Sequence, residues 1–180
     1  DCPSRRWVMK QVSTFDGHSG DGYDSLIYVF EYKNPYYDRF ERSFYGFDTV
    51  ITKQKYSLTA STDYRTITQA FINDDFYYQG KLLSELLTDS LGSKLTKTVN
   101  IYTITTCDGP VTYDFPALLA IENYFFEGNA TAQMQTRQEF TYDDFANIIL
   151  VNDKRDVAIT TDDVQSIISY KIDTVVNFLS

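Results

Sequence analysis

Short runs of aromatic and β-branched residues, separated by clusters of Gly, Asn and Asp, recur along this chain. Near the start, WVMKQVST (7–14) and SLIYVFEYK (25–33) flank the loop FDGHSGDGYD (15–24). Alternating apolar residues suit a pleated, half-buried surface, and Gly, Asn and Asp suit tight turns. The repeated rhythm predicts an all-β fold of consecutive antiparallel β-hairpins, arranged as a twisted sheet or an open sandwich.

Two segments leave the secondary structure open on local grounds. In KLLSELLTDSLG (81–92) the leucines recur at helical spacing, and Glu and Leu are good helix formers. The closing VQSIISYKIDTVVNFLS (164–180) fits either a strand pair or an amphipathic helix. Strand is the favoured interpretation for this last segment.

Length and charge limit the classes of function. The chain has 180 residues, enough for one β domain over 1–180 or for a segment of a larger protein. Its net charge of −9 disfavours nucleic acid, which requires a surplus of Lys and Arg on one face. No apolar run approaches the roughly 18 to 20 residues of a membrane-spanning helix. We expect a soluble chain, trimmed from a longer precursor.

The residues used most often in catalysis and metal binding are scarce. His18 is the one histidine, and its loop carries no sequence signature of a nucleophile, so we expect no catalytic residue. Cys2 and Cys107 are far apart, which leaves open a long-range disulfide in an exported protein or two unpaired thiols. One histidine and two distant cysteines do not make a zinc site, and we expect no metal and no cofactor.

Acidic residues also receive structural interpretations. Asp16, Asp21 and Asp24 could offer oxygen ligands to calcium, but their spacing is not that of an EF-hand loop. The doublets 74–75, 143–144 and 162–163 could suggest the paired acids of a glycosidase. Adjacent strand residues point to opposite faces, so a doublet does not form such a pair by itself. We interpret these residues as turn carboxylates.

The segment NPYYDRFERSFYGFDTV (34–50) interleaves aromatic residues with charges of both signs. In one interpretation its rings cover a sheet face while the charges pair across strands or hold a turn. In the other, exposed rings form an aromatic platform that stacks on sugars or on a partner chain. The candidate platform residues are Tyr36, Tyr37, Phe40 and Tyr45.

Two stretches carry a family resemblance. FTYDDFANIILVND (140–153) resembles the YD motif of Rhs/YD-repeat proteins, with Tyr142, Asp143 and Asn147 matching and Ala146 where the family has Gly. The earlier segment resembles a signature that precedes the repeats in shell-forming B components of bacterial toxin complexes and in related plasmid virulence proteins. Its matching residues are Tyr37, Asp38, Arg39, Glu41, Arg42, Phe44, Gly46 and Phe47. The similarity extends over about residues 7–160, with Gly80, Gly92 and Gly128 at the turns of degenerate copies.

The resemblance implies strand rather than helix for 81–91 and a structural role for the whole chain. Such proteins wrap antiparallel strands into a hollow shell around a polypeptide. We therefore expect a non-enzymatic structural or interaction module of a secreted or cell-surface protein. Its partners would be other repeats or an enclosed polypeptide, and exposed sheet edges would allow self-association. The alternatives are a secreted carbohydrate-binding module with an aromatic platform and, third, a glycosidase.

Overall fold

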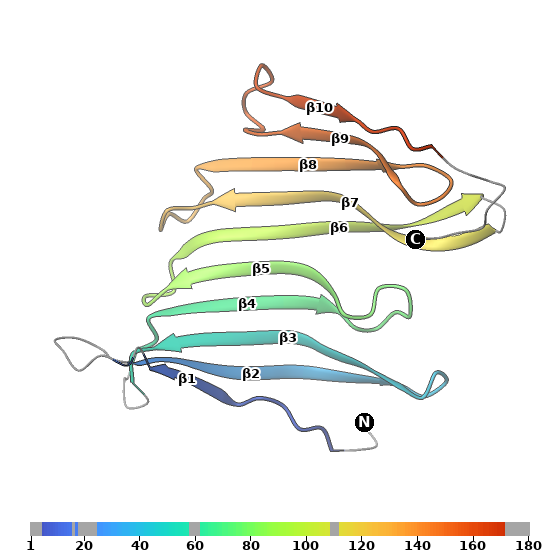
Figure 1. Ribbon diagram of the computed structural model, residues 1–180. Helices are drawn as coiled ribbons and strands as arrows, with labels where there is room; N and C mark the ends of the chain where they lie inside the picture. The colour runs from blue at the N-terminus through green and yellow to red at the C-terminus, as the bar shows by residue number, and fades with distance from the viewer. Residues whose placement is uncertain (1–4, 16, 18–24, 58–61, 109–111, 172–180) are drawn as a thin grey trace.

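The chain folds into one antiparallel sheet whose spatial order follows the sequence (Figure 1). A computed structural model describes residues 5–15, 17, 25–57, 62–108 and 112–171. The strands are β1 (Gln11–Phe15), β2 (Ser25–Asp38), β3 (Ser43–Lys55), β4 (Arg65–Ile72), β5 (Lys81–Asp89), β6 (Lys94–Asp108), β7 (Thr112–Phe125), β8 (Met134–Tyr142), β9 (Ile148–Lys154) and β10 (Val164–Ile167). The predicted all-β fold of consecutive hairpins is confirmed, as a single sheet rather than a sandwich.

Strand pairing decides between helix and strand in the two segments whose secondary structure the sequence left open. Residues 81–89 form β5 because Ile67 and Thr96 both pair with Leu87, which gives the leucines strand neighbours on both sides. β10 confirms strand for Val164–Ile167, and residues 172–180 lie outside the described part. At the N-terminal end, the observed strand differs from the predicted strand 7–14, since β1 begins only at Gln11.

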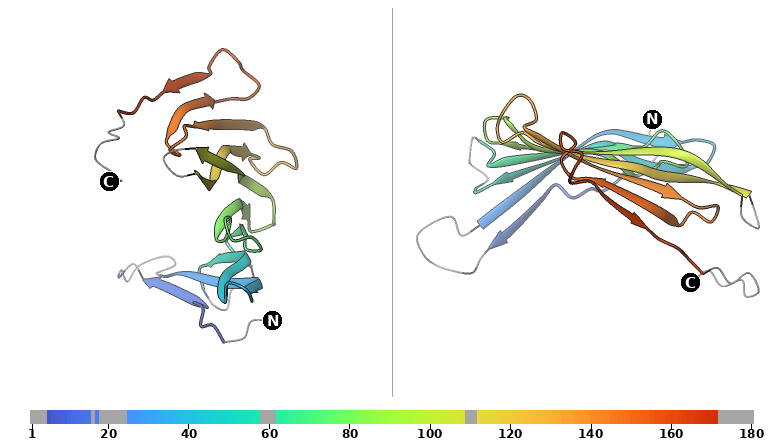
Figure 2. Two further views of the ribbon diagram at one scale, coloured as in Figure 1. Left: turned by 90° about the vertical axis from the view of Figure 1, so that its right-hand side faces the viewer. Right: turned by 90° about the horizontal axis from the view of Figure 1, so that it is seen from above.

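The sheet is bent, and its two edge strands curve toward the same side (Figure 2). Several pairings contain register shifts, for example between Ala70 and Phe71 in β4 and between Ile101 and Tyr102 in β6. Such bulges bend a strand and increase its twist. The result is a sheet with one concave and one convex face.

A single curved layer buries few side chains completely. Among the described residues, the buried hydrophobic side chains are Ile27, Tyr45, Cys107, Ala117, Ala120 and Phe126. Most other strand residues are half-buried, and many large hydrophobic side chains remain exposed, including Met134 at 41% and Ile167 at 79%. Soluble proteins rarely leave so much apolar surface uncovered, so the sheet faces are candidate contact surfaces.

Candidate functional site

The β2–β3 hairpin contains the segment rich in aromatics and charges. The Asp38 carboxylate holds its turn, because Oδ1 accepts hydrogen bonds of 2.8 Å from the N–H groups of Phe40 and Glu41. Arg42 follows with a positive φ of 53°, and pairing resumes between Asp38 and Ser43. Arg39, Glu41 and Arg42 are exposed around this turn. The segment therefore lies in the sheet, and one of its acidic residues organises the connection.

The candidate platform rings are divided by the strand geometry. Tyr36 contacts Tyr45, with ring centroids 5.8 Å apart, and Tyr45 is buried. Phe40 is 97% exposed at the turn. Tyr37 pairs with Phe44 and, as the next residue after Tyr36, points to the other face. The structure thus brings Tyr36 and Tyr45 together and places Phe40 and Tyr37 elsewhere, and sugar binding stays a prediction.

The hairpin is braced by a residue that sequence reasoning did not single out. Asn73 is buried, and its Nδ2 donates to the carbonyls of Asn34 (3.0 Å) and Gly46 (3.2 Å). Asn34 and Gly46 both have positive φ, so their carbonyls lie where the ladder is irregular. The side-chain amide therefore joins the two backbone carbonyls of this irregular part of the β2–β3 pairing. A lone Asn before the doublet 74–75 gives no signal of this contact in the sequence.

The YD motif forms the β8–β9 turn. Asp143 Oδ1 accepts hydrogen bonds from the N–H groups of Phe145 (2.9 Å) and Asn147 (2.8 Å). Tyr142 donates its hydroxyl to the Leu118 carbonyl at 2.9 Å, which ties this turn to β7. Ala146, in the position of the family's Gly, has a φ of +62°. The substitution keeps the left-handed conformation and carries its steric cost.

The β5–β6 turn repeats this geometry at Asp89. Its Oδ1 accepts from Leu91 (2.9 Å) and Ser93 (2.8 Å), and Gly92 takes the left-handed position with φ +83°. Hydrogen bonds from Ser93 lower the pKa of Asp89, partly offset by burial. At Asp143 burial acts to raise the pKa, but hydrogen bonds from Asn147 and Phe145 outweigh it and leave the pKa below its usual value. Both carboxylates therefore act as charged turn caps.

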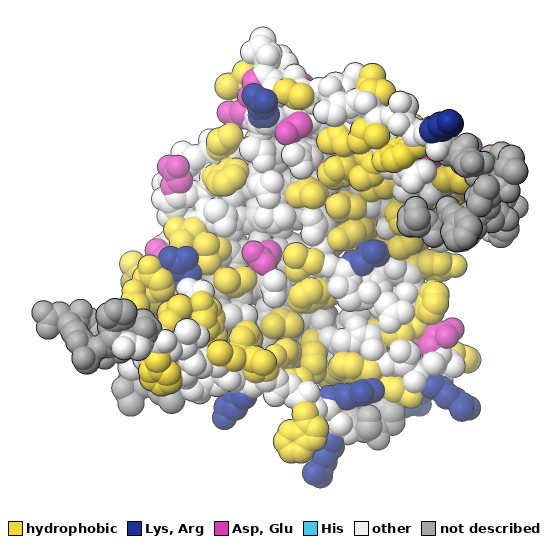
Figure 3. All heavy atoms as spheres, in the orientation of Figure 1, with side chains coloured by type: hydrophobic (Ala, Val, Ile, Leu, Met, Phe, Trp, Pro, Cys, Tyr) yellow, Lys and Arg dark blue, Asp and Glu magenta, His cyan; other side chains and the backbone are white. Residues whose placement is uncertain are grey.

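The register separates two kinds of sheet surface. Directly paired residues share a face, so transverse rows of side chains can be followed across the strands. One row consists of Phe30, Thr52, Ile67, Leu87, Thr96, Phe125 and Met134, and the next row on that face consists of Tyr32, Val50, Gln69, Glu85, Thr98, Asn123 and Thr136. We call the face with these two rows the concave face. Figure 3 looks onto the side toward which the edge strands bend, where hydrophobic side chains are spread widely and charged side chains are fewer.

The opposite, convex face carries the ion pairs. Arg137 bridges Glu122 on β7 and Glu139 on its own strand, and Lys154 on β9 lies 3.5 Å from Glu139. Lys53 pairs with Glu31 at the other end of the sheet. This separation of charge was not predictable from the amino-acid sequence, because it requires the register of every strand.

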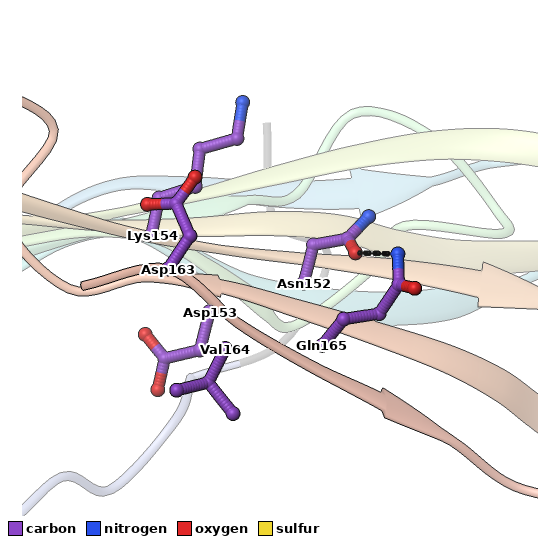
Figure 4. A pocket seen from close by; sticks show the side chains of 6 residues that line it. All are labelled: Asn152, Asp153, Lys154, Asp163, Val164 and Gln165. Atoms are coloured by element: carbon purple, nitrogen blue, oxygen red, sulfur yellow. Dashed lines mark hydrogen bonds between the residues drawn. The ribbon is translucent and has the colours of Figure 1, made fainter. Parts of the chain in front are cut away.

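A shallow hollow of about 210 Å³ lies at the β9–β10 hairpin (Figure 4). Asn152 accepts a hydrogen bond of 2.8 Å from Gln165 on one side of the hairpin, while Asp153 points to the other side. Asp163 lies on the same side as Lys154, away from Asp153. The two lining carboxylates therefore do not converge on one point.

The remaining candidate residues are placed as follows. Cys107 is buried, and Cys2 lies outside the described residues, so the disulfide stays a prediction. His18 and the calcium candidates at 16, 21 and 24 also lie outside them. Within the described ranges no group of three His, Cys, Asp or Glu side chains is placed to hold a metal ion, and no helix is long and apolar enough to cross a membrane.

Solved structures with a similar fold belong to toxin complexes. TcdB2-TccC3 without its hypervariable C-terminal region superposes with a TM-score of 0.61 at 13% identity, over 80% of this chain and 10% of that chain. TcdB2-TccC3 itself gives 0.60 at 13% identity, over 81% and 10%. The Photorhabdus luminescens Tc holotoxin pore gives 0.58 at 12%, over 72% and 9%. The chain has their fold.

The expected resemblance to toxin-complex shell proteins is therefore confirmed at the level of the fold. The chain spans about a tenth of the length of these toxin-complex chains. No family model matches the sequence, and no curated protein matches it. The similarity thus lies in the path of the backbone.

Proposed function

We propose that this chain is a non-enzymatic structural module of a larger secreted or cell-surface protein, in which its sheet forms part of a β-shell that encloses or packs against a polypeptide. The observation that carries the proposal is the single curved sheet with the toxin-complex fold. A single layer that leaves both faces half-exposed gains stability from contacts beyond itself.

The sheet edges support the same proposal. β1 and β10 each pair with one described strand, and every residue of both strands is exposed. An edge strand presents unpaired N–H and C=O groups to another chain. The part of β2 that extends beyond its pairing with β1 contains Lys33 and Pro35. Lys and Pro are residue types that discourage the addition of another strand. In β10, by contrast, Val164–Ile167 contains neither Lys nor Pro.

Measuring self-association of the isolated chain tests the proposal that it is a structural module. Light scattering after size exclusion should show an average mass that rises with protein concentration, because exposed edges and faces associate. Ile167→Lys, at the exposed β10 edge, should lower that mass, whereas Arg39→Lys at the β2–β3 turn should leave it unchanged. A strict monomer at all concentrations would contradict the proposal.

A further inference from the structure

The β7–β8 connection contains the sequence Glu-Gly-Asn-Ala-Thr at residues 127–131. Asn129, Ala130 and Thr131 match Asn-X-Ser/Thr, the acceptor pattern of asparagine-linked glycosylation. No other asparagine of the chain has Ser or Thr two residues later. Glu127 stands two residues before Asn129, where an acidic residue is an added requirement of bacterial-type oligosaccharyltransferases. The chain thus has one candidate acceptor, and its use depends on how the fold presents it.

The base of the β7–β8 connection is held against the neighbouring strands. Phe126 is buried, and the Lys94 ammonium lies 5.3 Å from the centre of its ring. The Gly128 N–H donates to the Lys94 carbonyl at 2.9 Å. On the far side of the connection, the Gln133 N–H donates to the Phe125 carbonyl at 2.7 Å. The residues between Gly128 and Gln133 are therefore presented on a fixed frame.

The acceptor residues project from this frame into solvent. Residues 127–131 are all exposed. The Asn129 N–H donates to the Phe126 carbonyl at 2.8 Å, whereas the N–H groups of Ala130 and Thr131 bond to no described residue. The backbone after Asn129 can therefore adopt the conformation that a modifying enzyme requires without loss of a sheet hydrogen bond.

The Asn129 side chain differs from those of the other described asparagines. Its amide is exposed and makes no hydrogen bond to a described residue. Every other described asparagine has a side-chain hydrogen bond within the sheet or a turn; these are Asn34, Asn73, Asn100, Asn123, Asn147 and Asn152. The acceptor asparagine is thus the one described asparagine whose amide the fold does not use.

We propose that Asn129 is a site of asparagine-linked glycosylation, modified by an oligosaccharyltransferase that takes its oligosaccharide from a lipid diphosphate. Nδ2 of Asn129 attacks C1 of the first sugar, the bond between C1 and the diphosphate oxygen breaks, and the lipid diphosphate leaves. Nδ2 gives one proton to a base of the enzyme. The enzyme recognises the acceptor through the hydroxyl of Thr131. The reaction takes place outside the cytoplasm, so the inference requires the export that the proposed function assigns to the chain.

The position of Asn129 is compatible with the shell module. The β7–β8 connection lies at the same end of the sheet as the β5–β6 turn, and β7 and β8 are interior strands (Figure 1). A bulky, hydrophilic glycan at this end would leave the edge strands β1 and β10 uncovered. The inference therefore also requires that this end of the sheet faces solvent in the assembled protein.

Modification by a purified enzyme tests the site. The full 180-residue chain is incubated with a bacterial-type oligosaccharyltransferase and a lipid diphosphate-linked oligosaccharide. Intact-mass measurement should show the addition of a single oligosaccharide, and peptide mapping should place it on Asn129. Asn129→Gln and Thr131→Ala should abolish the addition, whereas Thr131→Ser should retain it. Circular dichroism should be unchanged in all three variants, because neither side chain makes a hydrogen bond to a described residue.

A synthetic peptide of residues 124–134 separates the acceptor sequence from its presentation by the fold. The peptide and the folded chain should both be modified. Modification of the peptide alone would overturn the inference and leave the shell module standing. The protein isolated from its natural source should carry an oligosaccharide on Asn129, and an unmodified Asn129 there would also overturn the inference.

Self-association of the glycosylated chain tests the orientation of this end of the sheet. Light scattering should show the same rise of mass with concentration before and after glycosylation, since the edge strands stay uncovered. Loss of association on glycosylation would place this end in a contact and overturn the inference. A strict monomer before glycosylation would instead contradict the proposed function and not the glycosylation site.

Discussion

Asp143 and Asn147 close the β8–β9 turn with reciprocal hydrogen bonds. The Asn147 N–H donates to Asp143 Oδ1 at 2.8 Å, and the Asp143 N–H donates to the Asn147 carbonyl at 2.9 Å. Asp89 and Ser93 make the same two contacts at 2.8 and 3.0 Å. The two turns therefore allow paired experiments in one chain.

The left-handed residue of each turn should respond in opposite directions to exchange of Ala and Gly. Ala146→Gly removes a strained side chain at φ +62° and should raise the free energy of unfolding by up to about 1 kcal/mol. Gly92→Ala should lower it by about 1 kcal/mol, although space for the methyl group is open. Urea denaturation measures both changes, and equal signs for the two would contradict the turn assignment.

Stability should fall in acid partly through the turn carboxylates. The pKa values of Asp89 and Asp143 are lowered in the folded chain. Their contribution is therefore fully present above the unfolded pKa of about 3.9 and is lost as pH falls through the folded pKa. The double variant Asp89→Asn and Asp143→Asn should flatten unfolding free energy against pH below about pH 4. An unchanged slope would show that these groups do not act as charged caps.

Loss of Arg137 should cost more than loss of Lys53. Arg137→Met leaves Glu122 and Glu139 without their shared cation, and we expect a loss of about 1 to 2 kcal/mol in unfolding free energy. Lys53→Met removes the single Glu31 pair and should cost about 0.5 kcal/mol or less. Thermal denaturation at low and high salt measures the difference, which should shrink as salt screens the charges. Equal costs would argue against an ion-pair network.

The Asn73 brace should be sensitive to loss of its donor. Asn73→Ala removes the hydrogen bonds to the Asn34 and Gly46 carbonyls and should cost about 1 to 3 kcal/mol. Asn73→Asp should cost at least as much, since an ionised carboxylate cannot donate. Gln79→Ala, at an exposed amide in the following turn, serves as the control and should stay within about 0.5 kcal/mol. Chemical denaturation of the three variants decides whether Asn73 holds the hairpin.

The turns were the part of the structure most open to prediction. Gly80, Gly92 and Gly128 all have positive φ at turns, as their spacing indicated. The doublets at 74–75 and 143–144 include turn caps, since Asp75 accepts from Tyr77 as Asp143 does from Phe145. These signals are local, because a carboxylate caps N–H groups only a few residues away. The Asn73 brace was not predictable, since its partner carbonyls lie 39 and 27 residues away.

The aromatic segment 34–50 was likewise predictable only in part. Its place in a sheet, with charged residues at a turn, was one of the two interpretations of the sequence, but the burial of Tyr45 and the exposure of Phe40 were not predicted. A register shift at Tyr36 and Tyr37 decides which ring lies against which strand. Such a shift depends on the partner strand and leaves no mark in the residues themselves.

The amino-acid sequence by itself determined the alternation of strands and turns, because side-chain period and turn chemistry act within a few residues. Only the tertiary structure decided that the ion pairs of Arg137 and Lys53 lie on the convex face and that the two central rows of the concave face consist mainly of rings, aliphatic side chains, threonines and amides. A shift of one residue in a strand's register would exchange the faces of that strand, so the separation of charge exists only once every strand is paired with its neighbours.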